Sequence, residues 1–264
     1  KWLVGGQAAA TGLLAAEMAK RGVTGLRDAG PAWLDVICRP NAPQRLLEGI
    51  SAAHRYSEYE LQNGLVTKFF ATVGPAAGPL EALFRLIDEH GLRAEDVERI
   101  TVECTTRAAK FNSRHPADEL SSRTSLPYAM AVAMFTRDES ALLGPAFQRD
   151  FFMNAAVQAL EDRVCIVENE DYERQYPARS LAKVTVQLRS GDTFTREVDR
   201  AGPGRYLNPT DADIETKFTR ISQPVLGAAA CARVIEIVRG LDGLQDITPL
   251  LAALRPASTV SASR

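Results

Sequence analysis

The stretch that decides the fold most clearly is AKVTVQL (residues 182–188) and TFTREV (193–198), joined through Ser190-Gly191-Asp192. Apolar and polar side chains alternate strictly in both segments, which is typical of strands with one buried face. Gly and Asp in the short connection favour a tight turn. These residues therefore predict an antiparallel hairpin, and with it a sheet in the middle of the chain.

Working outward, the neighbouring sequence predicts more strands and several helices. Further strands are expected at three places: residues 65–70, 100–104 and 164–167. An amphipathic helix that ends at Gly91 carries four apolar side chains on one face: Leu80, Leu83, Phe84 and Ile87. Other helices are expected at 128–135, which Ser125 and Pro127 open, and at 152–160. Strands mixed with helices predict an α+β domain with an antiparallel sheet.

Both ends of the chain have the pattern of helices. At the N-terminal end, helices are expected over residues 7–20 (rich in small residues and stopped by Gly22), 32–38 and 44–51. At the C-terminal end, they are expected from a cap at Thr210 or Asp211 to Pro224, and over 228–238 and 247–254. We therefore expect helical segments from both chain ends to pack together, with the α+β domain inserted between them. The expected domains are 1–61, 62–205 and 206–264.

Composition excludes several classes of protein. The 264 residues carry 31 Lys and Arg against 33 Asp and Glu, a formal charge of −2, which is not the basic footprint of a nucleic-acid-binding protein. Apolar runs are shorter than the roughly 20 residues that cross a bilayer. The first residues do not have the pattern of a secretory signal. We expect a cytoplasmic protein with no membrane and no nucleic-acid partner.

The residue types that bind metals or phosphates are scattered. Four cysteines (Cys38, Cys104, Cys165, Cys231) and three histidines (His54, His90, His115) lie far apart. A zinc site needs such ligands at short spacing, so we expect no metal and reduced, mostly buried thiols. Gly202-Pro203-Gly204 lacks the spacing of a phosphate-binding loop. Residue patterns alone specify no reaction.

Four segments of the sequence, in the correct order, resemble the MmgE/PrpD family. They are Lys1-Trp2-Leu3-Val4-Gly5-Gly6 with Gly22-Val23-Thr24-Gly25, Thr67-Lys68-Phe69-Phe70, Ser125-Leu126-Pro127-Tyr128, and Asn208-Pro209 with Lys217-Phe218. The resemblance spans almost the whole chain. It also implies that a long helical segment, which supplies part of the family's active site, precedes the residues that correspond to Lys1.

The resemblance implies a lyase, either a dehydratase or a decarboxylase, acting on a small polycarboxylate such as 2-methylcitrate or cis-aconitate. It implies catalytic roles for Lys68 and Tyr128, substrate binding by Lys1, no cofactor, and a homodimer. Cations would neutralise substrate carboxylates and the charge that develops as a proton leaves the adjacent carbon, and a tyrosine can act as acid or base. Lys68 and Tyr128 are then expected to share one cleft.

Departures from the family pattern keep two alternatives open. Val4 stands where many members have His, and Ala71 replaces a Pro. The Cys and His that commonly follow are absent from residues 72–78. The loss of imidazoles that could transfer protons leaves room for an epimerase of a dicarboxylate. It also leaves room for a non-catalytic binding or assembly protein that keeps the fold.

Overall fold

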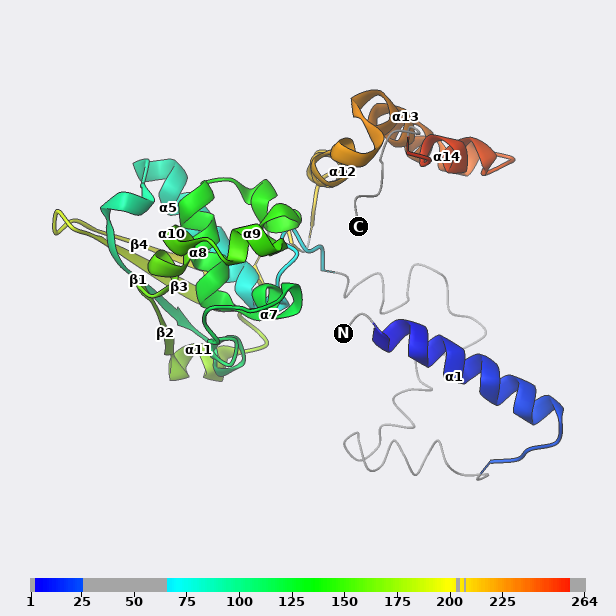
Figure 1. Ribbon diagram of the computed structural model, residues 1–264, viewed down its shortest axis with the longest axis horizontal. Helices are drawn as coiled ribbons and strands as arrows, with labels where there is room; N and C mark the ends of the chain where they lie inside the picture. Colours follow the sequence, from blue (N-terminus) through cyan, green and yellow to red (C-terminus); the bar gives the residue numbers. More distant parts are fainter. Residues whose placement is uncertain (1–2, 26–65, 203–204, 207, 257–264) are drawn as a thin grey trace. The chain divides into compact units, whose positions relative to one another are not determined.

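The computed structural model describes residues 3–25, 66–202, 205–206 and 208–256 (Figure 1). The chain divides between Leu65 and Val66 into two units, and each is described by itself. In the first unit α1 (Leu3–Lys20) confirms the helix expected over 7–20 and begins four residues earlier. The chain turns away after the helix at Gly22, whose φ of 89° lets Val23 donate its N–H to the Met18 carbonyl. The helices expected at 32–38 and 44–51 lie outside the described residues.

The second unit is built on a four-stranded sheet of order β2-β1-β3-β4. Its strands are β1 (Val97–Cys104), β2 (Val164–Glu168), β3 (Leu181–Leu188) and β4 (Thr193–Asp199). The hairpin of β3 and β4 is confirmed, with Val184 opposite Arg196 and Gly191 at a φ of 96° in the turn. Inward-facing residues such as Ile100, Val102 and Val184 are fully buried. The sheet therefore has the half-buried pattern that the alternation predicts.

The expectation of an antiparallel sheet is wrong at one edge. β1 and β2 pair in parallel, with Ile100 opposite Val164, while β1 and β3 pair antiparallel. Parallel neighbours need a long crossover, and residues 105–163 supply one that contains several helices. The sheet is therefore mixed, and the unit keeps its α+β character.

The helices of the crossover and α5 cover the sheet. α5 (Ala77–His90) contacts β3 and β4, and α8 (Leu126–Thr136) contacts α5 and β2. Residues 126–134 of α8 are buried without a break, so this helix forms the centre of the core. The shorter helices are α6 (Thr106–Ala109), α7 (Glu119–Thr124), α9 (Arg149–Phe152), α10 (Ala155–Glu161) and α11 (Glu170–Gln175). Turns of 3-10 helix lie at Gly74–Ala76, Ala94–Asp96, Glu139–Leu143, Pro145–Phe147 and Leu241–Gly243.

Two predicted elements differ locally. Residues 66–70 form no strand: Phe69 and Phe70 are adjacent and both buried, whereas a strand would point them to opposite faces. The helix expected over 152–160 is broken between α9 and α10. Asn154 causes the break, because its side-chain oxygen accepts the Ala156 N–H at 2.9 Å and starts a new helix.

The C-terminal helices follow in sequence as α12 (Asp211–Leu226), α13 (Ala228–Arg239) and α14 (Thr248–Ala253). Of the two expected caps, Thr210 is the one observed, and it forms a reciprocal capping box with Asp213. Pro224 does not end this helix; it lies in the last turn, and Gly227, with a φ of 82°, ends it. Packing of these helices with the N-terminal ones, and the domain limits 1–61, 62–205 and 206–264, stay predictions. None of the described helices is both long and apolar enough to cross a bilayer.

Candidate functional site

Lys68 projects from a backbone segment that is fixed on both sides. Phe69 and Phe70 are buried directly after it, and Phe70 stacks on Phe84 of α5 with ring centroids 5.7 Å apart. Before it, Thr67 donates its N–H to the Tyr206 carbonyl at 2.9 Å. The Lys68 residue itself is exposed, and its ammonium donates to the Thr72 carbonyl. The segment thus holds a cation at the surface on a well-anchored backbone.

An ion pair beside this segment joins Arg205 and Glu139. Arg205 donates to both carboxylate oxygens of Glu139, at 2.7 and 3.1 Å, and its guanidinium lies 4.8 Å from the Phe69 ring centroid. Hydrogen bonding to Glu139 raises the pKa of Arg205 although its partial burial opposes this. Glu139 therefore balances the charge of Arg205 within the protein, and this ion pair has a structural role.

Tyr128 lies in the first turn of α8, in the middle of the core. Ser125 caps this helix by accepting the Tyr128 N–H at 3.0 Å, as the Ser-Leu-Pro-Tyr pattern predicts. The Tyr128 side chain is fully buried, and its hydroxyl donates to the Ala146 carbonyl. Burial, with a smaller effect of Glu161, raises the pKa of Tyr128, so the hydroxyl stays protonated.

The predicted site residues therefore have different environments. Lys68 is exposed, whereas the Tyr128 side chain is fully buried by the described residues. Their shared cleft stays a prediction, and Lys1 lies outside the described residues. Among those residues no group of three or more His, Cys, Asp or Glu side chains is placed to hold a metal ion. Cys104, Cys165 and Cys231 are free thiols.

Comparison with known proteins identifies the evolutionary group of this chain. The model of the MmgE/PrpD C-terminal domain matches residues 70–243, which is most of the chain. The chain belongs to the MmgE/PrpD family. Two cis-aconitate decarboxylases, from Aspergillus terreus and from its strain NIH 2624, are each 21% identical over 197 residues. The aligned region covers 71% of this chain and 40% of each relative, so the chain spans well under half the length of these curated relatives.

The predicted site residues differ in whether the MmgE/PrpD domain match covers them. Tyr128 lies within the matched residues 70–243, whereas Lys68 lies two residues before them and Lys1 well before. Similarity within the matched domain therefore bears on the α8 segment more directly than on either lysine.

In this MmgE/PrpD chain, the sequence did not reveal a buried carboxyl beside the start of α8. Glu161, at the end of α10, is fully buried, and one of its oxygens accepts the His115 N–H at 3.1 Å. The same oxygen lies 3.4 Å from the Ser125 hydroxyl, while the other oxygen is buried without a hydrogen-bond partner among the described residues. Burial raises the pKa of Glu161, and the His115 N–H and nearby Arg114 partly oppose this.

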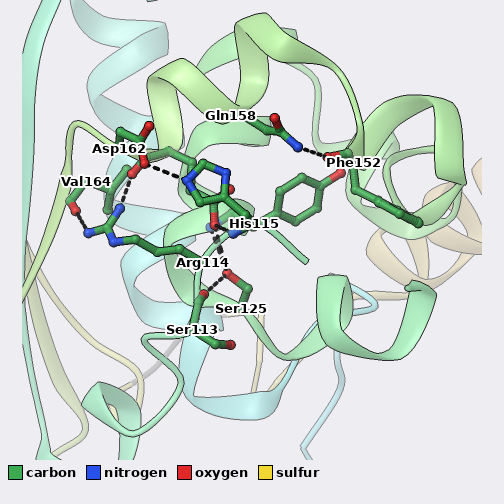
Figure 2. A network of polar contacts seen from close by, with 10 residues as sticks. Ser113, Arg114, His115, Ser125, Phe152, Gln158, Asp162 and Val164 are labelled. Carbon is green, nitrogen blue, oxygen red and sulfur yellow. Dashed lines mark hydrogen bonds and ion pairs between the residues drawn. The ribbon is translucent and has the colours of Figure 1, made fainter. Parts of the chain in front are cut away.

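The loop of residues 113–115 contacts Glu161 and the residues around it, and Figure 2 shows this loop with Ser125, Asp162 and Val164. Ser125 donates its hydroxyl to the Ser113 carbonyl at 2.6 Å, and Arg114 donates to the carbonyls of Glu161 and Val164. His115, at a φ of 50°, has its Nε2 atom 2.8 Å from Asp162. The His115 ring is exposed and lies against Asp162, while its backbone N–H donates to Glu161.

Proposed function

We propose that this chain is the C-terminal part of a lyase, a dehydratase or decarboxylase, that acts on a small polycarboxylate such as 2-methylcitrate or cis-aconitate. The observation that carries the proposal is membership of the MmgE/PrpD family over residues 70–243. Similarity to two cis-aconitate decarboxylases supports it. The proposal includes a homodimeric enzyme and acid/base chemistry without a cofactor, and both parts need their own tests.

The proposed chemistry begins at a carbon next to a carboxylate. Dehydration removes a proton from that carbon and expels a protonated hydroxyl group as water. Decarboxylation breaks the bond to a carboxylate, releases carbon dioxide and adds a proton to the carbon. Negative charge develops on the substrate in both reactions, and a nearby cation lowers the barrier by stabilising that charge.

Lys68 is the cation that we assign to this role. The Lys68 residue is exposed, and the buried side chains of Phe69 and Phe70 fix the backbone next to it. A lysine is a compact point charge and can follow charge that shifts between carboxylate oxygens. Lys1 remains the proposed second cation for substrate binding.

Tyr128 is the proposed acid or base, subject to one structural condition. Its hydroxyl donates to the Ala146 carbonyl and must leave that acceptor to reach a substrate. Its raised pKa suits a proton donor better than a base. If the hydroxyl keeps the Ala146 carbonyl throughout turnover, Tyr128 instead fixes the start of α8, and proton transfer falls to other groups.

The test is a kinetic comparison of Lys68→Ala with Lys110→Ala in the product of the whole gene. Lys110 is an exposed lysine after α6 and serves as the matched control. With 2-methylcitrate and cis-aconitate as substrates, Lys68→Ala should lower kcat/KM by roughly 10²–10³-fold, as expected for the loss of one charge-stabilising donor. Lys110→Ala should leave it unchanged.

Other outcomes separate the alternatives. Normal kinetics in Lys68→Ala would remove Lys68 from the site. A raised KM with constant kcat would make Lys68 an anchor for a remote carboxylate. Loss of turnover on addition of a chelator would contradict the cofactor-free part. Stereochemical conversion of a dicarboxylate such as iminodisuccinate, without turnover of the other two, would favour the epimerase.

A further inference from the structure

A pocket of about 320 Å³ opens where β1 ends. The start of α5, helix α6 and the first residues of β3 surround it. Two arginines line the pocket, Arg107 from α6 and Arg200 from the residue after β4, and no Asp or Glu is among its lining residues. The lining therefore carries two positive charges and no carboxylate to match them.

Both guanidinium groups retain unused hydrogen-bonding capacity. Arg107 donates to the Tyr176 hydroxyl at 3.2 Å, and Arg200 donates to the Gly74 carbonyl at 2.8 Å. Neither forms an ion pair with a carboxylate within the described chain. The Arg200 guanidinium also lies 4.8 Å from the Tyr206 ring centroid, and its buried Nε has no acceptor among the described residues. A guanidinium offers five N–H donors in a fixed plane, so each arginine has several left.

The rest of the pocket is shaped by small and apolar residues. Pro75, Pro79 and Leu181 contribute apolar surface. Gly78 allows α5 to approach β3 and Arg200 closely: a Cβ atom there would lie 3.3 Å from Ala182 Cβ and 3.4 Å from Arg200 Cδ. The stem of Arg200 therefore lies close to the backbone of α5. The Cys104 thiol has its pKa raised to about 12 by burial, so it stays neutral and leaves the positive charge of the pocket intact.

We propose that this pocket binds a small organic acid whose carboxylate is held by Arg107 and Arg200 and whose carbon chain lies against the apolar wall. Arginine matches a carboxylate with two parallel N–H···O bonds, which makes it the suitable cation for a planar anion. A volume near 320 Å³ is at the small end of ligand pockets, which limits the ligand to a few carbon atoms. Lys68 is not among the lining residues, so the site does not depend on the lyase assignment.

Inorganic phosphate shares the charge and the oxygen acceptors but has no carbon chain, so it is the ligand to separate from a carboxylate. Isothermal titration of the full chain with succinate and, separately, with phosphate, at constant ionic strength, makes the comparison. We expect saturable binding of succinate at one site, and weaker binding of phosphate because the apolar wall then contacts nothing.

Variants connect the binding to the pocket. Arg107→Gln and Arg200→Gln should each weaken succinate binding by about tenfold or more, since each removes a charged hydrogen-bond donor. Arg189→Gln, at the exposed end of β3 beside the hairpin turn, is the matched control and should bind like the wild type. Arg107 is exposed, so its variant tests the site even if Arg200→Gln fails to fold.

Three results would overturn the proposal. The first is that succinate shows no saturable binding at millimolar concentrations. The second is that Arg107→Gln binds succinate with unchanged affinity. The third is that phosphate binds more tightly than succinate. The last would leave an anion site but contradict a carboxylate ligand. Because binding is measured without turnover, failure here leaves the lyase proposal intact, and an inactive enzyme leaves this site intact.

Discussion

Removal of the buried Glu161 carboxyl should destabilise the protein more at low pH than at high pH. Glu161→Ala leaves the His115 N–H without its acceptor, whereas the Ser125 hydroxyl keeps the Ser113 carbonyl at 2.6 Å. One unsatisfied donor costs about 1–3 kcal/mol, and the lost methylene adds about 0.8 kcal/mol. We therefore expect the free energy of unfolding to fall by about 2–4 kcal/mol at pH 5.

The pH dependence follows from the direction of the Glu161 pKa. Burial raises that pKa in the folded state, so the folded protein binds the proton more tightly than the unfolded chain does. The stabilisation is complete below the unfolded pKa of about 4.3 and is lost as the pH rises through the folded value. Wild-type stability declines over this range and Glu161→Ala does not, so the difference between them should shrink by pH 8.

Urea denaturation at pH 5 and pH 8 measures both effects. Glu98→Ala, which removes an exposed carboxyl from β1, is the matched control and should change stability little at either pH. The comparison is repeated in a His115→Asn background, because the His115 ring contacts Asp162 beside Glu161 and Asn tolerates the φ of 50°. A deficit that stays constant or grows with pH would refute the account, since Glu161 would then be a stabilising charged group.

Two smaller predictions concern α8 and α5. Tyr128→Phe should lower the unfolding free energy by about 1 kcal/mol, because the Ala146 carbonyl loses its buried donor; unchanged stability would show that this hydrogen bond contributes nothing. Gly91→Ala should lower the unfolding free energy by about 1–2 kcal/mol, because this residue caps α5 at a φ of 64°. Gly240→Ala is the control and should lower it less, because Gly240 has a φ of −102°. Equal losses in urea denaturation would contradict the conformational argument.

The local features of the fold could be predicted because they depend on neighbouring residues. Strict alternation located the hairpin of β3 and β4, and Gly91 and Ser125 marked the ends of helices. The parallel pairing of β2 could not be predicted in this way. Strand direction depends on the route of the whole crossover over residues 105–163, and no local pattern encodes that route.

The candidate site was less accessible to sequence reasoning. A family resemblance singled out Lys68 and Tyr128, but burial of the Tyr128 hydroxyl is a property of packing against Ala146. Glu161 sits among charged neighbours in the sequence and resembles an ordinary helix end. Only the loop at 113–115, brought from far along the chain, makes it a buried carboxyl. Arg107 and Arg200 meet in one pocket for the same reason.

The lyase assignment is tested most directly by the fate of the substrate. The product of the whole gene is incubated with cis-aconitate and, separately, with 2-methylcitrate in deuterated water, and proton NMR follows both solutions. The account predicts enzyme-dependent turnover of at least one: decarboxylation would place deuterium on the product carbon, and dehydration would remove a carbon-bound proton. A folded protein that leaves both spectra unchanged would contradict the proposed lyase function.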